Sequence, residues 1–313
     1  MKKLCIYCIY RYIQYMHRTE ANEMTYLLEV NGVSGQIEDF KLEDIRFWLE
    51  PGYMMGIIGG NGTGKSTLLG MILGFYRPSG GNIRIDGLDR VNRGREAKAL
   101  MGCVLENCPF PMTFSPLENA ELFGGQYQGF DRMSFREHCR RFEVDLKRPL
   151  CKLSKGMVIK FQLAFALSHH PRLLVMDEPL SGLDPVFRRE FMGLLSDILS
   201  EETGIVMASH MTEELEQIGD YILMLHKSPA LHVSRQAFFA SREELDSKYL
   251  IIEGSGRQLE RYRDRMAAGV RAGEYGSSAL IYRGLSGGPE DVRTRRPMLE
   301  DFLYFFRDAM ILI

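Results

Sequence analysis

The chain has 313 residues, enough for one large domain or two of ordinary size. Hydrophobic residues make up 45% and charged residues 26%, a composition that is typical of globular proteins and argues against a disordered, collagen-like or disulfide-stapled chain. The net charge of −2 gives no general attraction for nucleic acid. The six cysteines are too few for a disulfide scaffold of this size, so we expect free thiols in a reducing compartment.

The first 23 residues are predicted to be an N-terminal extension. They combine basic residues with an apolar stretch, as a signal peptide does, but Arg11 interrupts that stretch and no small-residue cleavage site follows. Three interpretations stay open: a leader or misplaced start, an amphipathic helix on a membrane or partner, or an element of the domain. Cys5 and Cys8 lack a second pair or a nearby His, so zinc is not expected. No run reaches the roughly 18 apolar residues of a spanning helix.

Residues 24–227 show strand patterns alternating with helical ones, which predicts a mostly parallel sheet covered on its faces. Strands are predicted at 26–33, 40–50, 54–60, 172–179 and 204–210, and helices at 184–202 and 211–225. Between about 108 and 170 the strand signal is absent and apolar residues recur at helical spacing. This stretch is predicted to be a helical insert.

Residues 228–313 are predicted to form a C-terminal accessory region, a small α/β tail. Its expected elements are strands at 247–254 and 277–284, a charged helix at 257–268, a loop rich in Gly and Arg at 285–297, and a last helix at 298–306.

A glycine-rich segment connects the apolar strand at 54–60 to the helical pattern that follows it. Its residues are Gly59, Gly60, Asn61, Gly62, Thr63, Gly64, Lys65, Ser66 and Thr67. The glycines allow a tight turn whose N–H groups, with the positive end of the helix, hold a polyphosphate. In this P-loop, Lys65 is predicted to reach the β- and γ-phosphates and the Ser66 hydroxyl to ligate Mg²⁺.

A pair of acidic residues ends the buried strand at 172–179. Asp177 is predicted to hold Mg²⁺, through water because this ion keeps much of its hydration shell. Glu178 lies one residue further, at the strand tip, where a carboxylate can orient the attacking water and accept its proton. The P-loop and this pair together indicate nucleotide hydrolysis.

With these motifs the chain resembles the ATP-binding-cassette (ABC) family of ATPases. Leu153-Ser154-Lys155-Gly156-Met157 is similar to the family's signature LSGGQ, residues 181–185 resemble the loop after the acidic strand, and Ser209-His210 resembles the switch histidine. The resemblance covers roughly residues 25 to 227. It implies a P-loop NTPase fold, an ABC-type nucleotide-binding domain with a mostly parallel core sheet, an antiparallel β part, the helical insert and the C-terminal tail.

The resemblance also implies ATP and Mg²⁺ as cofactors and a head-to-tail dimer. Two such domains sandwich two ATP molecules, so the single P-loop and single signature require a second copy or a relative. Ser154 and the Gly156 N–H would grip the γ-phosphate across that interface, and His210 would touch the same phosphate and orient Glu178.

Several positions depart from the family pattern. Lys155 and Met157 stand where the signature usually has Gly and Gln, and Glu106 stands in place of a glutamine near the metal, where a carboxylate can still approach Mg²⁺. Counting back from the strand at 40–50, the family's aromatic that stacks on adenine is expected near Ile37, which cannot stack. Phe40 is the nearest aromatic substitute.

The resemblance implies an ATP-hydrolysing subunit that powers solute movement through a separate membrane subunit, of the bacterial exporter type, at the inner face of the cell membrane. We expect the membrane subunit to dock between the helical insert and the core, near residues 106–114. The alternatives are a soluble cassette ATPase of translation or DNA repair, and an idle binding module. No Asn-Lys-x-Asp motif supports a GTPase, and no nucleic-acid partner is expected.

Overall fold

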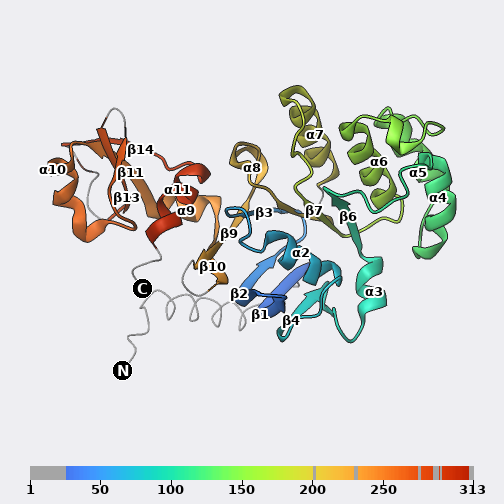
Figure 1. Cartoon of the computed structure of the whole chain (residues 1–313), viewed down its shortest axis with the longest axis horizontal. Coiled ribbons are helices and arrows are strands. Elements are labelled where there is room, and N and C mark those ends of the chain that lie inside the picture. Colours follow the sequence, from blue (N-terminus) through green and yellow to red (C-terminus); the bar gives the residue numbers. More distant parts are fainter. Residues whose placement is uncertain are drawn as a thin grey trace.

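The computed structural model describes residues 26–199, 202–228, 232–273, 276–284, 289 and 291–309. The N-terminal extension, with Cys5 and Cys8, lies outside these residues. The molecule is elongated, with a central sheet, the helical insert at one end and the C-terminal region at the other (Figure 1). The four described cysteines are free thiols, as expected.

The central sheet has ten strands in the order β5-β4-β1-β2-β10-β9-β3-β8-β7-β6. Their bounds are β1 Leu28–Ile37, β2 Phe40–Leu49, β3 Met54–Ile58, β4 Gly80–Ile85, β5 Leu88–Asp89, β6 Met101–Leu105, β7 Leu173–Asp177, β8 Gly204–Ala208, β9 Tyr221–Ser228 and β10 Val233–Ser241. Strands β6, β7, β8, β3 and β9 run parallel, whereas β1 pairs antiparallel with β2 and β4. The predicted parallel core with an antiparallel part is confirmed.

Alternate side chains of the parallel strands enter two apolar cores, one on each face of the sheet. On β7, Leu173 and Val175 face the core beneath α2 (Lys65–Leu73), while Leu174 and Met176 face the core that also contains residues of the helical insert. Because both faces are covered, β3 and β8 are buried along their whole lengths, as expected for parallel strands.

Helices cover the sheet and form the insert. The remaining helices before the C-terminal region are α3 Gly94–Ala99, α4 Pro116–Phe123, α5 Arg132–Arg141, α6 Lys155–Leu167, α7 Pro185–Ile198 and α8 Thr212–Ile218, with 3₁₀ turns η1 Gly124–Gln126 and η2 Leu150–Lys152. Side-chain caps fix the starts of several of these helices: Ser115 and Glu118 form a capping box on α4, and Asp184 accepts two N–H bonds at α7. The helical insert predicted between 108 and 170 contains α4, α5 and α6.

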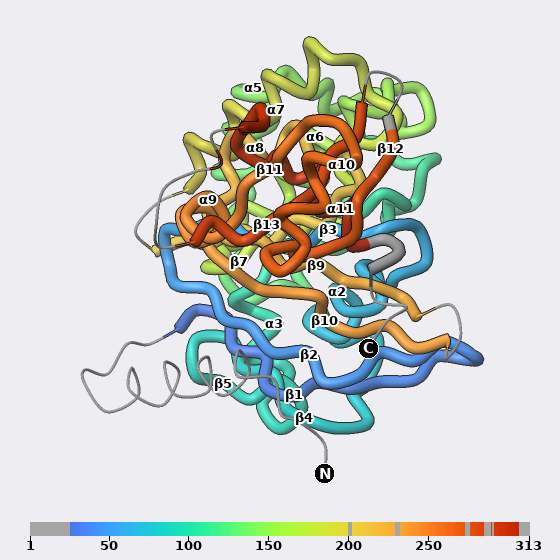
Figure 2. The backbone as a smooth tube through the Cα atoms, turned by 90° about the vertical axis from the view of Figure 1, so that its left-hand side faces the viewer, coloured from blue at the N-terminus to red at the C-terminus, as the bar shows by residue number. Residues whose placement is uncertain are grey.

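The C-terminal region has its own four-stranded sheet, in the order β12-β13-β11-β14. Its elements are α9 Arg242–Lys248, β11 Tyr249–Gly254, α10 Gly256–Leu259, η3 Glu260–Arg265, β12 Arg271–Gly273, β13 Gly276–Tyr282, β14 Arg293–Arg295 and α11 Leu299–Ala309. This region lies nearest the viewer when the molecule is viewed from that end (Figure 2). The expected α/β character and the last helix are confirmed.

The structure differs from the sequence-based expectations in several elements. Residues 293–295, expected to lie in a loop, form β14, which pairs with β11. Residues 221–225, expected to continue a helix, form β9, because this short apolar run is inserted between β3 and β10. The helix expected over 257–268 is one short α-helical turn followed by a 3₁₀ turn. Strand β10 pairs with β9 and β2, so the main sheet extends beyond residue 227, where we expected the ATPase domain to end.

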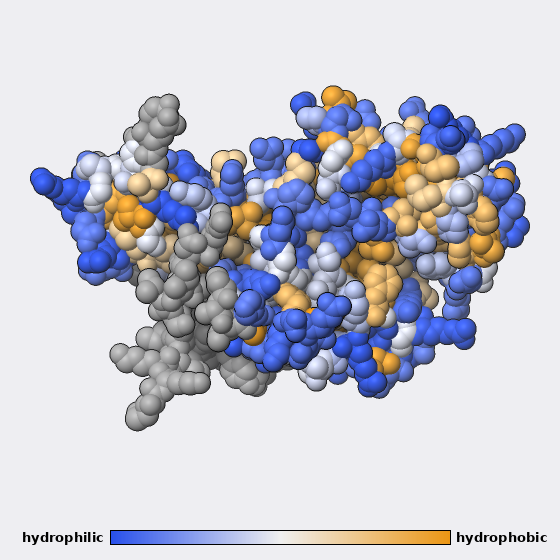
Figure 3. Space-filling model, viewed as in Figure 1, coloured by the Kyte–Doolittle hydropathy of each residue, from blue (hydrophilic) through white to orange (hydrophobic). Residues whose placement is uncertain are grey.

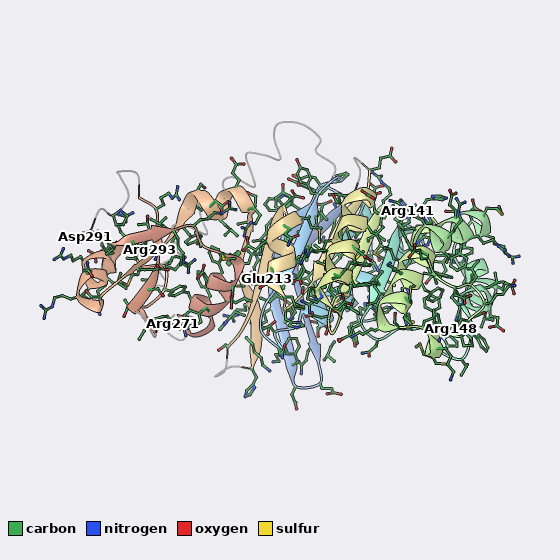
Figure 4. The ribbon with its side chains drawn as sticks, turned by 90° about the horizontal axis from the view of Figure 1, so that it is seen from above. Arg141, Arg148, Glu213, Arg271, Asp291 and Arg293 are labelled. Atoms are coloured by element: carbon green, nitrogen blue, oxygen red, sulfur yellow. The ribbon has the colours of Figure 1, made fainter. Side chains whose placement is uncertain are left out.

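Charged side chains lie along the whole molecule when it is viewed from above. Glu213 of α8 lies near the middle, Arg141 and Arg148 lie on the helical insert, and Arg271 and Asp291 lie on the C-terminal region (Figure 4). Among the described residues, no helix is both long and apolar enough to span a membrane.

Candidate functional site

The P-loop runs from the end of β3 to the start of α2, as the sequence predicted. Gly64 precedes the helix with a φ of 92°, a left-handed conformation that favours glycine, and a Cβ there would lie 2.4 Å from Cζ of Phe40. No side chain caps the first turn of α2, and no acidic residue stands in it. The free N–H groups and the positive end of the helix are therefore available to an anionic ligand.

Lys65 is buried within this loop. Its ammonium group donates to the carbonyl oxygens of Gly59 at 2.9 Å and Gly60 at 3.4 Å, and lies 3.7 Å from the Glu178 carboxylate. Asn61, Gly62 and Ser66 are exposed, whereas Thr63 is buried and donates to the Gly60 carbonyl. The loop thus holds the Lys65 ammonium group against its own backbone and leaves its outer residues exposed to solvent.

Asp177 ends β7 beside the start of α2. Burial raises the pKa of its carboxyl, and a hydrogen bond from the Ser66 side chain partly opposes that shift. Its Oδ1 is buried and has no hydrogen-bond partner among the described residues. A buried oxygen without a partner beside a serine hydroxyl suits a hard cation such as Mg²⁺. Within the described residues, no group of three or more His, Cys, Asp or Glu is close enough to form a metal cluster.

Glu178 and His210 are brought together at the tips of β7 and β8. One Glu178 oxygen, Oε2, lies 2.6 Å from Nδ1 of His210 and accepts the His210 backbone N–H at 3.2 Å. Glu178 has a φ of 46°, an unusual conformation for a residue other than glycine, and its N–H donates to the Ala208 carbonyl. Such strain costs about 1–3 kcal/mol and occurs most often at functional sites.

The signature segment begins α6, on the helical insert. The Ser154 oxygen accepts the Met157 N–H at 3.2 Å, which caps the helix and leaves the Ser154 hydroxyl proton free to donate. A Cβ on Gly156 would lie 2.5 Å from the Phe187 ring, so this helix start fits only glycine. Within the described part of the chain, no hydrogen bond or ion pair joins Ser154 or Gly156 to the P-loop.

Two of the residues that depart from the family pattern are in contact. The Lys155 ammonium lies 3.7 Å from Oε1 of Glu106, and both side chains are a little under half exposed. Glu106 follows β6, whose last residue, Leu105, pairs in register with Asp177. Glu106 therefore lies at the same edge of the sheet as the acidic pair.

Gln162 is a buried residue whose role the sequence did not reveal. Its side-chain amide bonds both the N–H and the carbonyl of Leu105, each at 3.1 Å, and so fixes α6 to the end of β6. Nothing in the sequence distinguishes this Gln from an ordinary polar position on a helix, because its partner is a backbone group far away along the chain.

Ile37 and Phe40 face each other across the β1–β2 turn. The Phe40 ring packs on Gly64, and the Lys227 ammonium lies 5.7 Å from the ring centroid. Phe40 thus contacts the P-loop from the side of β2.

An open cavity of about 1020 Å³ adjoins the P-loop. Gly60, Asn61 and His210 contribute to one part of its lining, and Leu303 and Tyr304 of α11 contribute to another. The C-terminal region therefore lines the same cavity as part of the P-loop, a contact that the sequence did not predict. The sequence signal for this contact is weak, since α11 presents only an amphipathic pattern.

The fold and this arrangement of P-loop, acidic strand, signature and histidine define an ATPase of the ABC type. Residues 42–181 match the family model described as ABC transporter. The Nod factor export ATP-binding protein I of Paraburkholderia xenovorans (strain LB400) is 30% identical over 275 residues, covering 86% of this chain and 88% of that protein. The chain belongs to the ABC transporter family.

Other relatives point the same way. The ABC transporter ATP-binding protein NatA of Bacillus subtilis (strain 168) is 29% identical, covering 67% of this chain and 89% of that protein. A solved ATP-binding subunit of an ABC transporter is 26% identical with a TM-score of 0.62, covering 70% and 91% of the two chains. The chain is an ATP-binding and ATP-hydrolysing subunit of an ABC transporter, and the alternative role in translation or DNA repair is not favoured.

Proposed function

We propose that this subunit binds Mg²⁺-ATP on the P-loop and uses Glu178 as the general base for hydrolysis. The observation that carries this proposal is the position of one carboxylate between Lys65, at 3.7 Å, and His210, at 2.6 Å. Lys65 and the N–H groups at the start of α2 bind the phosphates, and Ser66 and Asp177 hold Mg²⁺, which neutralises phosphate charge when it is bound. Glu106 is a further candidate for approach to the metal.

Glu178 orients the attacking water and accepts its proton, and His210 holds the carboxylate in place. The unusual backbone conformation of Glu178 fixes the side chain at the sheet edge before the substrate arrives. Chemistry at this site thus depends on positioning and on charge, as in other phosphoryl-transfer sites.

We infer a head-to-tail dimer with a second copy or a relative. Ser154 and Gly156 are positioned by α6 and by Phe187. In the proposed dimer, the Ser154 hydroxyl and the Gly156 N–H donate to a nucleotide on the other subunit. The support is that one chain supplies one P-loop and one signature, with no described hydrogen bond or ion pair between them. The two nucleotide sites would then form when the dimer closes.

We infer that the transporter's membrane subunit is a separate chain that docks between the helical insert and the core, near residues 106–114, at the inner face of the membrane. Hydrophobic residues gather over the end of the molecule that carries the insert (Figure 3). Within the predicted docking segment, Met112 and Phe114 are 40% and 38% exposed, whereas Phe110 packs between Phe123 and Phe165. Export is supported by the name of the Nod factor relative, and the transported substrate is left unassigned.

Replacing Glu178 with Gln tests the catalytic assignment. The amide keeps the size of the side chain but cannot accept a proton, so we expect ATP binding to persist and hydrolysis to fall roughly 10²–10⁴-fold. Binding is measured by titration with a fluorescent ATP analogue and hydrolysis by phosphate release, with Lys65→Ala as the variant that should lose binding. A normal hydrolysis rate in Glu178→Gln would show that another residue orients the attacking water and accepts its proton.

A further inference from the structure

Lys155 and Glu106 are charged residues of opposite sign that meet across two elements of the nucleotide-binding part. The Lys155 ammonium lies 3.7 Å from the Glu106 carboxylate, and it also approaches Gly182, where a Cβ would lie 3.6 Å away. Lys155 thus lies between the segment after β6 and the segment after β7. The Lys155–Glu106 contact is an ion pair between two partly exposed side chains.

The register of the sheet places Glu106 next to the acidic pair. Leu105 of β6 lies opposite Asp177 of β7 in a parallel pairing, so the following residues, Glu106 and Glu178, leave the sheet at the same edge. This edge carries the carboxylates of Glu106, Asp177 and Glu178. The Lys65 ammonium lies next to the Glu178 carboxylate, and the Lys155 ammonium lies next to the Glu106 carboxylate.

Helix α6 presents Lys155 to Glu106 from a fixed position. Gln162 lies seven residues further along, which is two helical turns, and therefore on the same face. Its two hydrogen bonds to Leu105 hold that face against the end of β6. Glu106 directly follows Leu105, so the hydrogen bonds of Gln162 hold both the helix that carries Lys155 and the chain that leads to Glu106.

We propose that Lys155 is a positioning residue that neutralises Glu106 and keeps its carboxylate from repelling the bound triphosphate. The two departures from the family pattern, Lys155 and Glu106, then act together, because the charge of one neutralises the charge of the other. This role deepens the proposed function and rests on it, since it requires Mg²⁺-ATP to bind on the P-loop of the same chain. A carboxylate without a nearby cation would instead disfavour an anionic ligand at this edge.

The test is a double-mutant cycle on Mg²⁺-ATP affinity, measured with a fluorescent ATP analogue. Lys155→Met removes the charge and keeps an unbranched chain, and we expect it to weaken binding roughly three- to fivefold, as suits a partly exposed charge pair. Glu106→Gln supplies the second background of the cycle, and its own affinity is the reference there. In that background Lys155→Met should change affinity by less than about twofold, because no uncompensated carboxylate remains.

Lys152→Met is the matched control. Lys152 is also exposed and precedes α6, but it carries no described ion pair, so its removal should change affinity by less than the removal of Lys155. The deficit of Lys155→Met should shrink as salt is raised, since partly exposed charges are screened. A merely structural effect would follow the melting temperature and would not respond to Glu106→Gln.

Two results would overturn the role of Lys155. Unchanged affinity in Lys155→Met would show that Glu106 needs no counter-ion. The same loss of affinity from Lys155→Met in the Glu106→Gln background would show that Lys155 acts on the phosphates and not on Glu106. Failure of the proposed function would give a different result: the parent would not bind Mg²⁺-ATP, or Lys65→Ala would bind it normally.

Discussion

At the scale of single residues, the aromatic ring of Phe40 is the candidate for stacking on the nucleotide base. It packs on Gly64 of the P-loop, whereas Ile37, near which the family has an aromatic, offers no ring. Stacking on an aromatic side chain contributes roughly 1–3 kcal/mol and depends little on which base is bound. Phe40→Ala should therefore weaken ATP at least about fivefold, while ATP and GTP stay within about tenfold of each other in both proteins.

Direct titration with the two nucleotides measures these affinities, and Phe75→Ala, which removes an exposed ring beyond the end of α2, is the control. If Phe40→Ala bound ATP like the parent, the base would lie elsewhere. A strong preference for ATP that disappeared in Phe40→Ala would show instead that this ring selects adenine.

The raised pKa of Asp177 predicts a pH dependence of Mg²⁺-ATP binding. Burial favours the protonated carboxyl, which cannot ligate a cation, so the fraction of Asp177 able to hold Mg²⁺ falls as pH approaches the raised pKa from above. As the pH is lowered, the affinity for Mg²⁺-ATP should therefore begin to fall at a higher pH than it would if Asp177 had the pKa of an ordinary Asp. Titrations of the parent and of Asp177→Asn over the same pH series separate this effect from protonation of ATP itself. Parallel profiles for the two proteins would contradict it.

At the scale of elements, the sequence predicted what local patterns and fixed motifs encode. The strand carrying Asp177 and Glu178 was recognised from its apolar run and its acidic end, and the P-loop from the spacing of its glycines. The run 221–225 was misassigned because five apolar residues suit a buried strand and a helix equally, and only its neighbours in the sheet decide. The contact of Lys155 with Glu106 depends on how α6 packs on β6, which no local pattern encodes.

Helices α6 and α7 pack closely at Gly156. A methyl group there would lie 2.5 Å from the Phe187 ring, which is itself stacked on Phe191 with centroids 6.1 Å apart. We expect Gly156→Ala to lower the free energy of unfolding by about 1–3 kcal/mol, the usual cost of overpacking. Urea denaturation gives the value.

Gly193→Ala in α7 is the matched control for that change. No atom lies within 4 Å of a Cβ at this position, so the substitution should raise stability by about 0.5–1 kcal/mol through helix propensity. Equal effects of the two substitutions would mean that Phe187 moves aside without cost.

At the scale of the whole molecule, the C-terminal region and the central sheet share one apolar core. Phe302 of α11 is fully buried, with its ring centroid 5.4 Å from that of Phe238 on β10 and 5.3 Å from that of Tyr249 on β11. The cluster that contains Phe302 also includes Ile222 and Met224 of β9. The two sheets are therefore expected to unfold together.

Phe302→Ala tests this expectation, with Trp48 as the probe. The single tryptophan of the chain lies on β2 against Phe239, with ring centroids 4.8 Å apart, and reports on the central sheet. Loss of the Phe302 ring should cost about 3–5 kcal/mol and lower the unfolding midpoint equally by Trp48 fluorescence and by far-ultraviolet circular dichroism. Tyr304→Ala, at a position that is 46% exposed on the same helix, should shift both midpoints only slightly. A fluorescence midpoint that stayed at the parent value while dichroism was lost earlier would mean that the C-terminal region unfolds independently, and that its contact with the edge of the nucleotide site can open without disturbing the sheet.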